Sequence, residues 1–236
     1  MNKETALAII KDSAKIYNKN LCNKNVMFIF ETKNKQQMYV ETLFLPNHFR
    51  HLTGFSENRK GKKISATNFY LDCLKNKISP NDLIQENPFA LKKLNVLPSL
   101  MKIDQISKMF GEYDKYSGIL LQTEKISGNE NACMGFVKDG KYYVPNTSLN
   151  ENIKKITTNT SKIIGILKKE SYQKKYTEFI YIKKGYNINQ ISKISDINKY
   201  IDFNNIFSLN KETDKEIIKF LTENININAK DDEEEM

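Results

Sequence analysis

The pattern of apolar and polar residues predicts a helix at the start of the chain, followed by two strands. Apolar side chains in residues 4–19 recur with the period of a helix. The residues on this apolar stripe are Ala6, Ile9, Ile10, Ile16 and Tyr17. Residues 26–31 and 37–45 are rich in β-branched and aromatic residues, with turn-forming polar residues between them. Pro46 cannot donate a backbone hydrogen bond, so we expect it to end the second strand.

The middle of the chain has the signals of short helices. Ser65 is a suitable N-cap for a helix that reaches Asn76, and Pro80 is suited to the first turn of another. Residues 87–110 are apolar but interrupted by Pro88 and Pro98, which predicts several short helices in place of one long one.

From residue 116 onward the pattern changes to that of strands. The expected strands are 117–125, 132–138, 141–144, 161–169 and 177–183. Asp139 and Gly140 form a two-residue turn between the second and third of these. This order predicts an α+β fold in which the N-terminal and middle helices pack on a curved antiparallel sheet.

The domain organisation follows from the absence of internal repeats and of a long Gly/Ser linker. We expect a single domain over residues 1–209, followed by residues 210–236 with a helix at 214–221 and an acidic, disordered tail.

The charge of the chain favours a polyanionic partner. Its 37 lysines and arginines exceed its 28 acidic residues, and five of these acids lie in residues 231–235, so the rest of the chain is more basic still. Such an excess attracts phosphate polymers over a long range, which makes RNA the expected partner, ahead of an anionic membrane surface or an acidic protein. A lysine- and asparagine-rich composition is also typical of proteins from A/T-rich genomes. The positive charge alone therefore does not establish that the protein binds nucleic acid.

Other sequence features narrow the class of protein. Cys22, Cys73 and Cys133 are too far apart for a zinc motif and odd in number, so we expect them to be reduced and buried. The sequence contains no nucleotide-binding loop and no zinc or calcium motif, so no cofactor and no metal ion are expected. No signal-peptide pattern and no apolar run of membrane-spanning length is present, which predicts a cytoplasmic protein that is not inserted in a membrane.

Both histidines and both arginines of the chain lie within residues 48–59, namely His48, Arg50, His51 and Arg59. Histidine exchanges protons near neutral pH, and the planar fork of arginine is suited to phosphate. Together they are the groups needed for metal-independent cleavage of a phosphodiester: a base, an acid and a cation. An alternative is that Phe49, Leu52 and Phe55 simply make this segment a buried turn.

A resemblance to a known family rests on this segment and on two others. Residues 51–54 read HLTG after a predicted strand, and residues 65–73 then begin a helix with the pattern SA..FY..C. Residues 135–147 contain GF followed by YVPNT in the predicted hairpin. Over residues 25–185, these motifs resemble the phage-borne nuclease-like domains of the barnase, EndoU, colicin and RelE superfamily. The resemblance implies a small helical part on a curved antiparallel sheet, with a ribonuclease-type site on the sheet face.

The resemblance also implies roles for individual residues. His51 would be the general acid or base, Thr53 would orient the substrate, and Arg50 would bind phosphate. Thr147 would offer its hydroxyl at the rim of the site. Lys141 and Tyr143 project from one face of the hairpin strand, because alternate residues share a side.

The remaining candidates have less specific roles. His48, Arg59 and Asn146 are candidates for binding RNA phosphates. The second proton-transfer group stays open among His48, Tyr143 and a lysine.

Two functional hypotheses are preferred at this point, and a third, a structural or packaging protein of a virion, stays open. The first is a metal-independent endoribonuclease of phage or mobile-element origin, acting on an RNA such as tRNA or a guide RNA. The second is a non-catalytic RNA- or protein-binding inhibitor of a host nucleoprotein, such as an anti-CRISPR protein, built on the same basic surface.

Overall fold

The computed structural model describes residues 1–206, so the helix expected at 214–221 and the acidic tail lie outside the described residues. The first helix is α1 (Lys3–Asn20), and the side chain of Asn2 caps it by accepting a hydrogen bond from the backbone N–H of Thr5 at 2.8 Å. The hairpin of β1 (Lys24–Glu31) and β2 (Gln37–Phe44) follows, as the sequence predicts.

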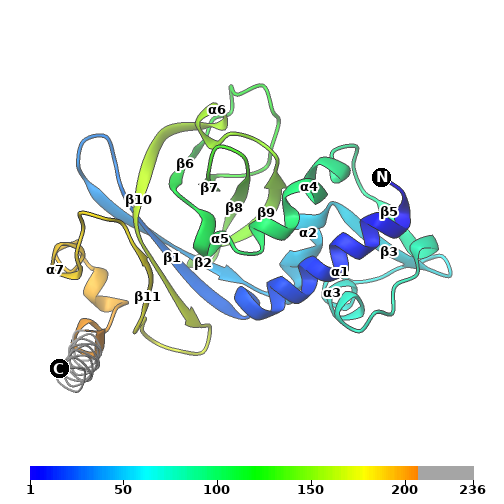
Figure 1. Ribbon diagram of the computed structural model, residues 1–236, viewed down its shortest axis with the longest axis horizontal. Helices are drawn as coiled ribbons and strands as arrows, with labels where there is room; N and C mark the ends of the chain where they lie inside the picture. The colour runs from blue at the N-terminus through cyan, green and yellow to red at the C-terminus, as the bar shows by residue number, and fades with distance from the viewer. Residues whose placement is uncertain (207–236) are drawn as a thin grey trace, which may run out of the picture.

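The main sheet closes on itself (Figure 1). Its other strands are β6 (Met109–Tyr113), β7 (Lys125–Gly128), β8 (Cys133–Asp139), β9 (Tyr142–Leu149), β10 (Thr157–Glu170) and β11 (Phe179–Ile182). The strand order is β1-β2-β9-β8-β7-β6-β10-β11, and β1 pairs with β10 as well as with β2. All strands except β11 therefore form a closed barrel, and β11 adds to β10.

The barrel corrects the expectation of a curved, fully antiparallel sheet. The mixed α and β character is confirmed, but β1 and β10 pair along eight register positions and join the two ends of the sheet. The pairing of β2 with β9 is parallel and joins Thr42 to Tyr143. Sequence patterns do not encode such long-range pairings, because each strand only shows which of its faces is apolar.

The helices that precede β6 lie at one end of the barrel, where the chain also forms a small three-stranded sheet. The elements of this part are η1 (Pro46–His48), α2 (Phe49–Thr53), β3 (Phe55–Arg59), β4 (Lys62–Lys63), α3 (Ala66–Leu74), η2 (Pro80–Asp82), β5 (Leu83–Gln85), α4 (Ala90–Leu100) and α5 (Ile103–Ile106). Ser65 caps α3 as expected, by accepting from the N–H of Asn68 at 3.2 Å. The helix expected after Ser79 is only the short η2, and β5 follows it.

Two further boundaries differ from the sequence-based expectation. Residues 109 and 110, the end of the stretch expected to be helical, begin β6, whereas most of the strand expected at 117–125 is a loop. Gly118 has a φ of 81° there, and the Asp114 side chain accepts from the N–H of Tyr116 at 2.9 Å, which stabilises a turn. The strands expected at 161–169 and 177–183 are confirmed as β10 and β11. The remaining elements are α6 (Ile153–Ile156), α7 (Ile188–Ile191) and η3 (Ile197–Lys199).

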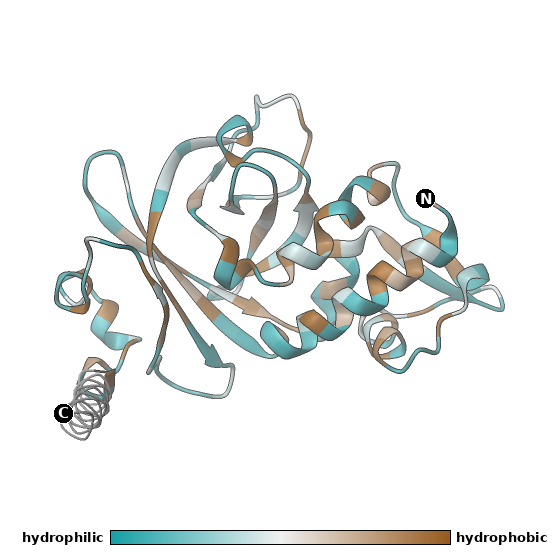
Figure 2. Ribbon diagram, in the orientation of Figure 1, coloured by the Kyte–Doolittle hydropathy of each residue, from teal (hydrophilic) through white to brown (hydrophobic). Residues whose placement is uncertain are grey.

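A continuous apolar core joins the barrel to the helices. Phe28 of β1 and Phe136 of β8 have ring centroids 6.3 Å apart, and because these strands are not neighbours, the contact crosses the barrel interior. Phe44 links this interior to Tyr17 of α1, whose ring also contacts Phe49. Figure 2 shows the apolar residues along the barrel strands and along α1, α3 and α4. The helical end is thus packed rigidly against the barrel.

A second apolar cluster covers the outside of β1 and β10. Side chains from the segment after β10, among them Tyr176 and Ile197, pack on Met27 and Ile164 of these strands. The Tyr176 hydroxyl also donates to the carboxylate of Glu41 at 2.9 Å.

Two further expectations concern the cysteines and the absence of membrane-spanning segments. All three cysteines are free and buried, as the sequence predicts. None of the helices within residues 1–206 combines the length and the apolarity needed to cross a membrane.

Candidate active site

The histidine- and arginine-bearing segment forms a short helical turn with a buried and an open side. Phe49, Leu52 and Phe55 are buried, as the alternative of a buried turn requires. The side chains of Arg50 and His51 lie on the open side of the turn, where they line a pocket. The turn ends at Gly54, whose φ of 73° is accessible to glycine, and a Cβ there would lie 2.9 Å from the Cβ of Ala90. Gly54 therefore allows the end of α2 to approach α4 closely.

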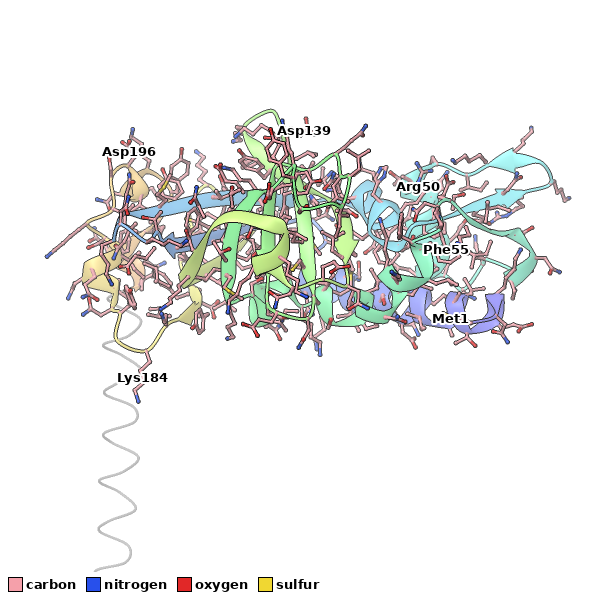
Figure 3. All side chains as sticks on the ribbon, turned by 90° about the horizontal axis from the view of Figure 1, so that it is seen from above. Met1, Arg50, Phe55, Asp139, Lys184 and Asp196 are labelled. Carbon is pink, nitrogen blue, oxygen red and sulfur yellow. The ribbon has the colours of Figure 1, made fainter. Side chains whose placement is uncertain are left out.

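The hairpin strand β9 packs against both α2 and α4, so two segments almost 100 residues apart in sequence meet. Between them lies a pocket of about 200 Å³, here called the cationic pocket. The side chains that define it are Arg50, His51, Lys63, Glu86, Lys93 and Asn146. Figure 3 shows Arg50 at the helical end, beside the hairpin whose tip carries Asp139. Arg50, His51 and Asn146 therefore line one pocket, whereas Lys141, Tyr143 and Thr147 are not among its lining residues.

Glu86 was not recognised as a site residue from the sequence. Strand β5 pairs with β3, and the backbone N–H of Glu86 donates to the carbonyl of Gly54 at 2.9 Å, which places this carboxylate beside the HLTG segment. Lys63 pairs with Glu86 at 2.7 Å. The hydrogen bond from Lys63, followed by one from Ser56, lowers the pKa of Glu86, so the carboxylate is ionised at neutral pH.

The ammonium of Lys93 lies close to His51 and influences the pKa of its imidazole. Lys93 Nζ donates to the backbone carbonyl of His51 at 3.1 Å, and burial lowers the pKa of Lys93 to about 8. The pKa of His51 is lowered by burial first, then by the positive charges of Arg50 and Lys93, while Glu86 acts in the opposite direction. The pocket thus holds a carboxylate, a titratable imidazole and three cationic side chains.

Lys63 and Lys93 were also missed, because the sequence contains many lysines and nothing distinguishes these two. A signal for Glu86 is equally absent, since it follows a strand of only three residues. All three residues were missed for the same reason: the local sequence does not show which residues will surround a pocket.

Three of the predicted site residues have structural positions instead. His48 is 6% exposed, and its Nδ1 accepts from the N–H of Leu45 at 3.1 Å. Burial, and then the neighbouring His51, lowers the pKa of His48 to about 4. His48 is therefore neutral at physiological pH and offers no charge to a phosphate.

Thr53 and Arg59 are likewise occupied by the fold. Thr53 is fully buried, and its hydroxyl donates to the carbonyl of Arg50 at 2.8 Å and accepts from the N–H of Phe55. The guanidinium of Arg59 is paired with the buried carboxylate of Glu57 and, at 2.9 Å, with Asp72. Thr53 and Arg59 therefore stabilise the fold around the segment that carries His51. From the sequence, both residues were expected to contact the substrate.

The hairpin residues divide into two groups. The Asn146 side chain joins the cationic pocket and also holds the loop before β7, by donating to the carbonyl of Gln122 and accepting from Thr123 Oγ1 at 3.2 Å. Thr147 lines a neighbouring groove. Lys141 and Tyr143 line neither the cationic pocket nor this groove. The Nζ of Lys141 lies 4.6 Å from the ring centroid of Tyr142, and the ring of Tyr143 contacts a lysine of β8.

Within residues 1–206, no group of three or more His, Cys, Asp or Glu side chains is arranged to hold a metal ion.

Comparison of the sequence with known families places this α+β chain in a class of nuclease-like proteins. The sequence model of the phage-Barnase-EndoU-ColicinE5/D-RelE like nuclease 4 (PBECR4) family matches residues 9–185, so the chain belongs to this family. The matched region includes every side chain of the cationic pocket. Among curated proteins and among solved structures, no match to the chain is found. The resemblance to this nuclease-like superfamily is thereby confirmed.

Proposed function

We propose that this protein is a metal-independent endoribonuclease that cleaves RNA by internal transesterification in the cationic pocket. The observation that carries the proposal is the presence of Glu86, His51 and Arg50 around one pocket of about 200 Å³. A carboxylate and an imidazole are the two proton-transfer groups that such a reaction needs, and a cation stabilises the charge that develops on the phosphate.

The lowered pKa of Glu86, which keeps this carboxylate ionised, favours one assignment of roles. Glu86, whose pKa is lowered by Lys63, acts as the base that takes the proton from the ribose 2′-hydroxyl. The 2′ oxygen then bonds to phosphorus, the bond from phosphorus to the 5′ oxygen breaks, and protonated His51 donates its proton to that leaving oxygen. The products are a 2′,3′-cyclic phosphate and a free 5′-hydroxyl.

The cations of the pocket have a separate task. Arg50, Lys63 and Lys93 surround the position of the phosphate. Their fixed charges favour the transition state, in which negative charge accumulates on the phosphate oxygens. A bound phosphate also raises the pKa of His51, because an adjacent negative charge favours the imidazolium form. The basic character of the whole chain supports RNA as the substrate.

Cleavage of RNA in the presence of EDTA tests this proposal. The wild-type protein should release fragments with 2′,3′-cyclic phosphate ends. His51→Ala and Glu86→Gln should each slow cleavage by roughly 100-fold or more, because each removes one proton-transfer group. Glu130→Gln is a matched control, because Glu130 is an exposed carboxylate that pairs with a lysine, Lys154, as Glu86 does. The Glu130→Gln variant should cleave RNA at the rate of the wild type.

Two results would contradict the enzymatic proposal. The first is RNA that stays intact with the wild-type protein, and the second is cleavage at an unchanged rate by both variants. A protein that binds RNA without cleaving it would instead act as a non-catalytic inhibitor of a nucleoprotein.

A further inference from the structure

A second and larger hollow adjoins the cationic pocket. It has a volume of about 490 Å³, within the range of small-molecule sites, and lies between α4, the loop from β6 to β7 and the end of β9. We call it the apolar groove. The side chains that characterise it are Phe89, Lys92, Ile119, Leu120, Thr147 and Ser148.

Two large apolar side chains of the apolar groove are open to solvent. Phe89 is 62% exposed and Leu120 is 98% exposed, so neither contributes much to the core of the protein. Lys92 Nζ lies 6.0 Å from the ring centroid of Phe89. An exposed aromatic ring next to an ammonium group is the combination on which proteins stack the bases of single-stranded nucleic acids.

Ser148 gives a second and independent indication of a ligand. It lines the apolar groove, it is 1% exposed, and its hydroxyl is buried without a hydrogen-bond partner in the structure. A buried polar group without a partner is unfavourable, and such groups in native proteins call for an explanation. A small shift of the groove wall that opens this hydroxyl to the polar edge of a bound nucleobase would supply the missing hydrogen bond.

The apolar groove is continuous with the cationic pocket. Asn87 and Lys93 line both hollows, and Asn146 of the pocket is adjacent in sequence to Thr147 of the groove. A nucleotide whose phosphate lies at Arg50 and His51 would therefore extend its base toward Phe89 and Leu120. The lysines on α4 match the negative charge of the connecting backbone.

We propose that the apolar groove binds one unpaired nucleobase next to the scissile phosphate, so that the substrate is single-stranded RNA or an RNA loop. This inference rests on the proposed function, because the phosphate position is that of the cationic pocket. A base inside a duplex is stacked and paired, and its face does not reach a groove of this kind, whereas a base in a loop is free to leave the stack.

A binding experiment with strands that resist cleavage tests this inference. Three fluorescent 2′-O-methyl RNA probes of equal length are compared by anisotropy: a single strand, the same strand in a duplex, and a strand of abasic residues. We expect the single strand to bind roughly tenfold more tightly than the other two, because only its bases are free to stack on the protein.

Variants of the apolar groove locate the effect. Phe89→Ala combined with Leu120→Ala should weaken binding of the single strand by roughly tenfold and leave the abasic strand unaffected. Ser148→Ala should also weaken single-strand binding, without loss of thermal stability, because the hydroxyl has no partner to lose. Tyr172→Ala is the control, since Tyr172 is an aromatic residue that is 81% exposed and does not line the groove.

Equal affinity for the three probes would overturn the inference, as would an unchanged affinity of the Phe89 and Leu120 double variant. Binding of none of the probes would also overturn it and would point to a protein partner for the groove. Because the probes lack a free 2′-hydroxyl, these results do not depend on cleavage. A failure of the groove proposal is therefore distinguishable from a failure of the proposed ribonuclease activity.

Discussion

His48 and His51 are three residues apart, yet the fold gives them opposite properties. His48 is buried under the turn and its Nδ1 accepts a backbone hydrogen bond, whereas His51 lies at the edge of the cationic pocket. The sequence favours His51 as the acid or base but does not show that His48 is buried. The difference arises because one side of a single helical turn faces the core and the other faces the pocket.

The buried state of His48 predicts a pH dependence of stability. Its pKa is 6.5 when unfolded and about 4 when folded, so its contribution is complete above pH 6.5 and is lost as the pH falls toward 4. Between pH 7 and pH 5, this group should lower the free energy of unfolding by about 2 kcal/mol. His48→Asn keeps an acceptor for the N–H of Leu45 but does not titrate. Urea unfolding at both pH values should show a smaller loss in the variant, and an equal loss would contradict the assignment.

At the scale of elements, short strands and turns that are hard to predict carry the site. Strand β5 has only three residues, but its pairing with β3 places Glu86 beside Gly54. The β3–β4 hairpin is in turn held to α3 by Arg59, which pairs with Asp72 and with the fully buried Glu57. These contacts hold β3 to α3, and both elements also pack against the histidine-bearing turn.

The two arginines should therefore respond differently to the same substitution. Arg59→Met leaves the buried carboxylate of Glu57 without its partner and should lower the midpoint of thermal unfolding by several degrees. Arg50→Met is the matched variant, because Arg50 lines the cationic pocket and donates only part of its guanidinium to the carbonyl of Ile64. It should weaken RNA binding with little change in the midpoint. Thermal unfolding and RNA titration of both variants measure this, and the opposite pattern would return Arg59 to the list of phosphate ligands.

At the scale of the whole molecule, the barrel has one weak seam. β1 pairs with β2 and with β10 along its entire length, while β2 meets β9 at the single pair of Thr42 and Tyr143. Opening at this seam breaks few backbone hydrogen bonds and leaves the other pairings intact. Because β9 also carries Asn146 and Thr147, motion at the seam would reach the cationic pocket and the apolar groove.

Hydrogen exchange measured residue by residue tests the seam. Along β2, the amides that point toward β1 should be strongly protected, and the alternate amides that point toward β9 should exchange faster by a factor on the order of 100. Equal protection of both sets of amides would show that the barrel closes as firmly at β9 as elsewhere.

The amino-acid sequence by itself determined the elements whose signals are local. The apolar stripe of α1, the hairpin of β1 and β2, the Ser65 cap of α3 and the turn between β8 and β9 all follow from neighbouring residues. The short motifs around His51 and in the hairpin were sufficient to indicate the family, and they include Arg50, His51 and Asn146 of the pocket. Periodicity and turn chemistry act over a few residues, so these elements are predictable without knowledge of their tertiary contacts.

Only the tertiary structure decided how these elements meet. The pairing of β1 with β10 closes the barrel across more than 100 residues, and the pairing of β3 with β5 brings Glu86 to His51. The tertiary structure also buries His48 while His51 stays open to the pocket, and it pairs Arg59 with two carboxylates. These outcomes depend on which surfaces pack together and exclude water. A linear pattern of apolar and polar residues does not contain that information, because it records only that a face is to be buried and not against what.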